Sequence, residues 1–97
     1  MKKLFIVSLI KNGLLGGYIV ADDDSIIFRT GKVTVPQKYR NLKLEYKEIR
    51  EASIGRLFLL PTVSVTLYSG EAYKFAVFFG KRRFVDILKQ MGVGKQA

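Results

Sequence analysis

Two clusters of basic side chains are the strongest candidates for chemistry in this 97-residue chain. The first lies in or beside a polar stretch and consists of Lys32, Lys38, Arg40 and Lys43. The second is a continuous run made of Lys81, Arg82 and Arg83. Lys and Arg form charge-assisted hydrogen bonds with phosphate and carboxylate oxygens, so both clusters predict contact with an anionic group. The alternative for the first cluster is a solvated loop that protects a sheet edge from aggregation.

The second cluster is expected at the start of a helix. Cations there oppose the helix dipole by about 0.3–1 kcal/mol each, whereas free N–H groups beside cations attract phosphate or carboxylate. Asp86 lies three residues after Arg83 and four after Arg82, and an ion pair with either would offset the penalty. Anion binding and simple solvation therefore both remain open for this cluster.

The composition excludes much of enzyme chemistry. The chain has no Cys, and hence no disulfide, thiolate nucleophile or Cys-ligated metal. It also has no His, the commonest general base and metal ligand. Asp22, Asp23 and Asp24 are interpreted as a turn, because no EF-hand-like spacing follows them. We therefore expect no enzymatic activity, no cofactor and no metal.

The net charge narrows the class of partner. The chain has 17 Lys and Arg against 8 Asp and Glu, which gives +9. Such an excess favours encounter with an anionic membrane surface, an acidic protein or a nucleic acid.

Most of the chain has the period-two pattern of half-buried strands, interrupted at short intervals by turn residues. The strand-like segments are Leu4 to Lys11, Leu14 to Ala21, Ser25 to Arg29, Leu42 to Lys47, Ile54 to Leu60, Thr62 to Tyr68 and Tyr73 to Phe79. The turn signals are Asn12-Gly13, Asp22 to Asp24, Pro61 and Ser69-Gly70. Gly16-Gly17 predicts a bulge or sharp bend, and Leu42, Tyr46 and Ile49 also fit helical spacing.

The period changes after Gly80. Phe84, Ile87, Leu88 and Met91 lie on one face of a helix that Gly92 is placed to end. The aromatic residues on the apolar phase are expected in the core, namely Phe28, Tyr46, Tyr73, Phe75, Phe79 and Phe84. Phe78 lies on the opposite phase to Phe79 and is therefore expected to be exposed and to mark an interface.

Met1-Lys2-Lys3 followed by Leu4 to Ile10 has the outline of a short signal sequence. The apolar stretch has only seven residues, no small-residue cleavage site follows it, and about 20 residues are needed to span a bilayer. We interpret it as a buried first strand and expect no transmembrane segment. The expected location is cytoplasmic, with peripheral contact at the inner membrane surface as an option.

These elements predict a mainly β fold in a single domain, residues 1–97. We expect a curled antiparallel sheet or barrel of six to seven strands, capped by one C-terminal α-helix.

The order of elements resembles the pleckstrin-homology (PH) superfold, in particular bacterial PH-like and GRAM-like domains. The similar stretches are Tyr18 to Arg29, Leu44 to Ile49, and Val63 to Met91 with Ser69-Gly70-Glu71 at a tight turn. The sequence departs from many phosphoinositide-binding PH domains at the first hairpin, where Lys11 is the sole basic residue. The resemblance implies a binding module, and members of the superfold also serve as protein-interaction modules or assemble into rings.

Three functions follow, in order of preference. The first is a non-catalytic PH-like module that contacts an acidic partner, either anionic lipid headgroups or a protein, through the two basic clusters. The second is a structural module that forms a homo-oligomer through strand edges and Phe78. Non-specific nucleic-acid binding is the least favoured, because the aromatic residues are better explained as core than as stacking platforms.

Overall fold

The computed structural model describes residues 2–11, 13–31 and 37–93. Lys32, one of the candidate basic residues, lies outside these ranges. The elements in chain order are β1 (Lys3–Ile10), β2 (Leu14–Ala21), β3 (Ser25–Arg29), α1 (Gln37–Arg40), β4 (Asn41–Glu45), the 3-10 helix η1 (Tyr46–Glu48), β5 (Ile49–Leu57), β6 (Leu60–Leu67), β7 (Ala72–Val77) and α2 (Lys81–Gln90).

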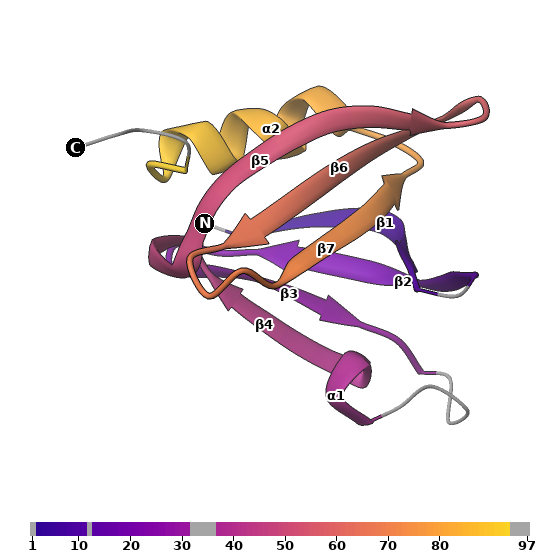
Figure 1. Ribbon diagram of the computed structural model, residues 1–97, viewed down its shortest axis with the longest axis horizontal. Coiled ribbons are helices and arrows are strands. Elements are labelled where there is room, and N and C mark those ends of the chain that lie inside the picture. The colour runs from indigo at the N-terminus through magenta and orange to yellow at the C-terminus, as the bar shows by residue number, and fades with distance from the viewer. Residues whose placement is uncertain (1, 12, 32–36, 94–97) are drawn as a thin grey trace.

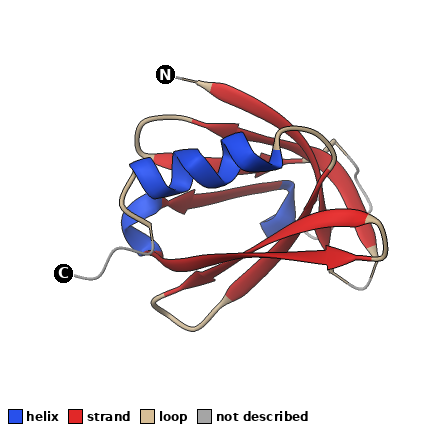
Figure 2. Cartoon of the chain, turned by 90° about the horizontal axis from the view of Figure 1, so that it is seen from above, coloured by secondary structure: helices blue, strands red, loops and turns tan. Residues whose placement is uncertain are grey.

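The seven strands form one antiparallel sheet in the order β4-β3-β2-β1-β7-β6-β5. The sheet curls into a half-barrel, and α2 lies across its opening (Figure 1). Seen from above, α2 lies over the strands (Figure 2). The predicted curled antiparallel sheet with a single C-terminal helix at its end is confirmed. The short helix α1 was not predicted, because the polar stretch around it has no helical period.

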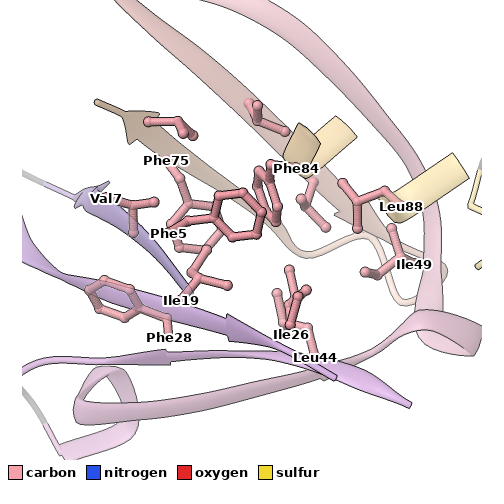
Figure 3. Close-up of a cluster of buried hydrophobic side chains, with 14 of the residues drawn as sticks. Phe5, Val7, Ile19, Ile26, Phe28, Leu44, Ile49, Phe75, Phe84 and Leu88 are labelled. Carbon is pink, nitrogen blue, oxygen red and sulfur yellow. The ribbon is translucent and has the colours of Figure 1, made fainter. Parts of the chain in front are cut away.

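The core fills the concave side of the sheet. Side chains alternate between the two faces of a strand, so Phe5, Val7 and Leu9 of β1 point inward while Ile6 stays exposed. The Phe28 and Phe75 rings meet across the core with their centroids 5.7 Å apart (Figure 3). The one charged residue of β1, Lys3, is exposed at the start of the strand, and β2 has none.

Helix α2 seals this core. Its buried residues Phe84, Val85, Ile87 and Leu88 form one apolar stripe, and the Phe84 ring lies 5.1 Å from the Phe5 ring, centroid to centroid (Figure 3). The helix ends as predicted: Gly92 has φ 90°, and the Val93 N–H donates to the Leu88 carbonyl at 3.0 Å.

Two expectations about apolar residues near strand ends are wrong. Phe79 was placed in the core, but it is 76% exposed, because β7 ends at Val77 and the chain bends before α2. The segment Ile54 to Leu60 was expected as one strand, but it contains the end of β5, a turn at Phe58-Leu59 and the start of β6. Hydrophobicity alone does not distinguish a buried strand from an exposed apolar turn.

The Gly16-Gly17 pair does not form the predicted bulge. β1 and β2 pair without a register shift from Lys3↔Ala21 to Ile10↔Leu14. Gly17 is needed instead for a close approach, because a Cβ there would overlap the Arg29 carbonyl oxygen and lie 3.0 Å from the Phe28 ring. The register shift in the sheet occurs between Ile49 and Glu51, where β5 pairs with β6.

The close approach predicts a difference between two neighbouring substitutions. We expect Gly17→Ala to lower the free energy of unfolding by about 1–3 kcal/mol, because the backbone of β3 must move to admit a methyl group. Gly16→Ala is the matched control, since its nearest neighbour, Ser8 Oγ, would lie 3.9 Å from the new Cβ. Urea unfolding of both variants tests this, and equal midpoints would contradict it.

Candidate functional site

The connections between strands lie on two sides of the half-barrel. In Figure 1 the β1–β2 hairpin, the β5–β6 tip and α1 lie on one side. The β7–α2 connection lies beside the first half of β1, where the Phe78 N–H donates to the Ile6 carbonyl at 3.1 Å. We call the first side the cationic end, and its described residues are 10, 11, 13, 14, 29–31, 37–41 and 56–60. The β2–β3, β4–β5 and β6–β7 connections lie at the other end, which we call the acidic end, formed by residues 21–25, 43–51 and 67–72.

Charge follows this division. Of the eight acidic residues, all except Asp86 of α2 belong to the acidic end: Asp22, Asp23, Asp24, Glu45, Glu48, Glu51 and Glu71. The described residues of the cationic end include no Asp or Glu and five basic residues: Lys11, Arg29, Lys38, Arg40 and Arg56. A strand connection at this end therefore presents positive charge without a compensating carboxylate in its own sequence.

At the acidic end, cations and carboxylates lie together. Lys47 Nζ is 3.6 Å from Glu45 Oε2, and Arg50 Nη2 is 3.5 Å from Glu51 Oε1. Asp22 Oδ1 accepts hydrogen bonds from the N–H groups of Asp24 at 2.9 Å and Ser25 at 2.8 Å. These bonds lower the pKa of Asp22, and the charge of Lys43 lowers it further. The interpretation of the three aspartates as a turn is confirmed.

The structure divides the first predicted basic cluster. Arg40, the last residue of α1, is exposed at the cationic end, and Lys38 belongs to the same helix. Lys43 lies further along β4, which runs toward the acidic end. There it lines a hollow of about 360 Å³ with Asp23, Asp24 and Glu45. Carboxylates surround Lys43, so it is separated from Arg40 in both position and electrostatic setting.

Two cations that were not among the candidates join Arg40 instead. Lys11 Nζ lies over the ring of Tyr39 of α1, 5.9 Å from its centroid, which brings the β1–β2 hairpin beside α1. Arg29 Nε donates a hydrogen bond of 3.1 Å to Asn41 Oδ1. Assigning the strands to an antiparallel meander would have grouped Lys11, Arg29 and the residues of α1 at one end of the sheet. The spacing of basic residues along the sequence does not show this grouping.

The second predicted cluster begins α2. Gly80 is the N-cap in a left-handed conformation, without a side-chain cap, and the first turn of the helix contains no acidic residue. Arg82 and Arg83 are exposed, and Lys81 is half-buried. The cluster is set back from the hairpin tips of the cationic end, because α2 turns back over the half-barrel (Figure 1).

One member of this cluster lines a groove between β1 and the start of α2. The groove has a volume of about 470 Å³. Its lining combines two cations with apolar side chains and consists of Lys3, Leu4, Phe5, Phe79, Gly80 and Arg83. A site of this composition fits an amphipathic anion better than a small hydrophilic one.

The cationic end also exposes large apolar side chains. Three of them lie in its hairpins, namely Leu14 (47% exposed), Phe58 (91%) and Leu59 (92%). Phe78 (38%) and Phe79 (76%) are exposed in the β7–α2 connection beside β1. Phe78 is exposed, as expected, but other aromatic side chains are more exposed. Within the described residues, no helix is both long enough and apolar enough to cross a membrane. The end thus combines positive charge with protruding hydrophobic groups.

Comparison with known proteins informs the fold. No protein-family model matches the chain, and no curated protein matches it in sequence. Among solved structures it is similar to the C-terminal domain of an unknown protein from Leishmania infantum, with a TM-score of 0.73 and 12% identity. The match covers 92% of this chain and 81% of that one. A likeness at this identity shows the shared architecture alone.

The residues around the hollow at the acidic end make hydrogen bonds that stabilise the fold. The described residues contain no group of three or more acidic side chains placed to hold a metal ion. The Tyr46 hydroxyl donates to the Asp22 carbonyl oxygen at 2.8 Å, and the Tyr46 N–H donates to the Asp24 carbonyl at 3.0 Å. Burial, together with the nearby aspartates, raises the pKa of Tyr46 to about 12.

This raised pKa predicts how stability changes in alkaline solution. Tyr46 ionises at pH 10 in the unfolded chain and at about 12 in the folded one, so its contribution is complete below pH 10 and is lost between pH 10 and 12. We expect Tyr46→Phe to cost about 1 kcal/mol at neutral pH through the lost hydrogen bond. The difference in unfolding free energy between the wild-type chain and Tyr46→Phe should become smaller above pH 10. A constant difference up to pH 12 would contradict the raised pKa of Tyr46.

Proposed function

We propose that this chain is a non-catalytic PH-like module that binds an anionic membrane surface through its cationic end. The observation that carries the proposal is the coincidence, at one end of the half-barrel, of cations without carboxylates and exposed apolar side chains. Cations attract lipid phosphates and carboxylates, and apolar groups can enter the region below them. An acidic protein would match the charge but leaves the apolar side chains unexplained.

The architecture supports the PH-like part of the proposal. Seven antiparallel strands followed by one amphipathic helix are the order of elements that the resemblance implies. The first hairpin supplies Lys11 as its basic residue, and Lys11 contacts Tyr39 of α1, the helix that also carries Arg40. The proposed recognition is therefore of surface charge, rather than of one inositol phosphate held in a pocket.

The expected electrostatic affinity is modest. A basic residue near an anionic surface contributes about 1 kcal/mol, so the four described cations Lys11, Arg29, Arg40 and Arg56 would supply roughly 4 kcal/mol. That sum corresponds to an affinity of about 1 mM. The interaction should weaken as salt shortens the screening length, which is about 10 Å at 0.1 M.

Self-assembly is the second candidate function, and the sheet edges favour it. The strand order ends at β4 on one side and at β5 on the other, and β5 is nine residues long with mostly exposed side chains. A long exposed edge can pair with a second copy. Light scattering over a concentration series separates this function from membrane binding, because a strict monomer cannot assemble through its edges.

The membrane proposal is tested with paired charge variants in sedimentation with vesicles. We expect Lys11→Gln/Arg56→Gln to reduce binding to phosphatidylcholine vesicles containing 30% phosphatidylserine by about 10- to 30-fold, since each cation is worth roughly 1 kcal/mol. Lys47→Gln/Arg50→Gln removes the same charge from the acidic end, where both cations lie beside carboxylates, and should change binding less than threefold.

Two controls complete this test. Pure phosphatidylcholine vesicles should bind weakly, and binding to the anionic vesicles should fall as salt rises from 0.05 to 0.5 M. Equal losses for the two variant pairs would assign the effect to net charge rather than to the cationic end. Absence of binding to either vesicle would remove the membrane function and leave an acidic protein as the partner to seek.

A further inference from the structure

The tip of the β5–β6 hairpin carries an unusual concentration of exposed hydrophobic side chains. β5 and β6 pair up to Leu57↔Leu60, which leaves Phe58 and Leu59 as a two-residue turn. Their side chains are 91% and 92% exposed, more than any other large hydrophobic residue among those described. Figure 1 shows this tip projecting beyond the body of the half-barrel.

The turn is also locally unfavourable. Two-residue hairpin turns favour Asn and Gly, because their central positions adopt positive φ. Phe58 has φ 56°, and it is the one non-glycine residue with positive φ in the described part of the chain. A bulky side chain in this conformation carries a steric cost. Neither turn chemistry nor core packing explains an aromatic residue here, so an external contact is the remaining reason for it.

The surroundings of the tip identify the class of contact. Arg56, next to Leu57, is exposed, and the cationic end has no carboxylate in its sequence. A second copy docked tip to tip would bring like charges together. The area that two protruding side chains can bury is also far smaller than the roughly 800 Å² that each partner contributes to a stable protein interface. An anionic bilayer satisfies both conditions, because its headgroups pair with the cations and its hydrocarbon accepts the tip.

We propose that the β5–β6 tip is a hydrophobic wedge that inserts Phe58 and Leu59 below the headgroups of an anionic membrane. This rests on the proposed membrane function and adds to it the contact that cations alone cannot supply. Exposed apolar side chains gain free energy when they enter the acyl region. Insertion of both should strengthen binding about 10- to 100-fold over the electrostatic contact.

Tryptophan fluorescence tests insertion directly, because the chain contains no Trp. Phe58→Trp places a single reporter at the tip. Tyr68→Trp is the matched control, because Tyr68 is 66% exposed at the β6–β7 connection of the acidic end. With vesicles of phosphatidylcholine and 30% phosphatidylserine, we expect the emission of Phe58→Trp to shift to shorter wavelength and to be quenched by brominated acyl chains. The emission of Tyr68→Trp should not change.

Sedimentation of the same vesicles separates the two proposals. Binding without a shift or quenching at Phe58→Trp would overturn the wedge and leave the membrane function intact. No binding by the wild-type chain would overturn both. A shift that grows with protein concentration in the absence of vesicles would show the tip packing against a second copy, and would also overturn the wedge.

Stability measurements exclude a purely structural role for the tip. We expect Phe58→Ser/Leu59→Ser to weaken vesicle binding 10- to 100-fold while the melting temperature changes little, because both side chains project into solvent. Phe58→Gly should hold or raise the melting temperature, since glycine accepts positive φ freely, and should still weaken binding. Loss of folding in these variants, or unchanged vesicle binding in both, would contradict the proposal.

Discussion

The antiparallel pairing of neighbouring strands is the constraint on which the rest of the molecule depends. Strands that follow one another in the chain are antiparallel neighbours or are joined through η1, and in Figure 1 the connections between them lie alternately on two sides of the half-barrel. A sequence that places its carboxylates in every second connection therefore segregates charge in space. Here the β2–β3, β4–β5 and β6–β7 connections carry the acids, and the other four carry none. The cationic end therefore results from the placement of acidic residues in every second strand connection.

The packing of α2 stabilises the open, curled sheet. Phe84 against Phe5, with Ile87 and Leu88 beside it, covers core residues that the seven strands cannot enclose by themselves. To reach that position the chain must turn sharply at Gly80, in a left-handed conformation. The turn exposes Phe79 and sets Lys81, Arg82 and Arg83 at the start of the helix, so closing the core also shapes the groove beside β1.

Two features of the chain work against local stability. The first turn of α2 carries cations where a helix favours Asp or Glu, and the β5–β6 turn carries Phe58 at positive φ where Gly or Asn fits best. Elsewhere local preference and fold agree: Asp22 caps its turn, and Gly92 ends α2. In natural proteins, residues that conflict with local structural preference are expected at functional sites. The start of α2 and the β5–β6 turn are therefore the segments in which a function is most expected.

The elements that depend on local periodicity and turn chemistry could be predicted from the amino-acid sequence. The boundaries of β2 and β3, the aspartate turn and the apolar stripe of α2 were all predictable, because alternation, turn residues and capping act over a few positions. Which cations lie close together could not be predicted in this way, because it depends on the three-dimensional fold. In the fold, Lys11 lies beside α1 and Lys43 lies among carboxylates. Phe79 and the Phe58-Leu59 tip are exposed. These outcomes depend on where strands end and which connections share an end of the sheet, and both are set by contacts between residues distant in sequence.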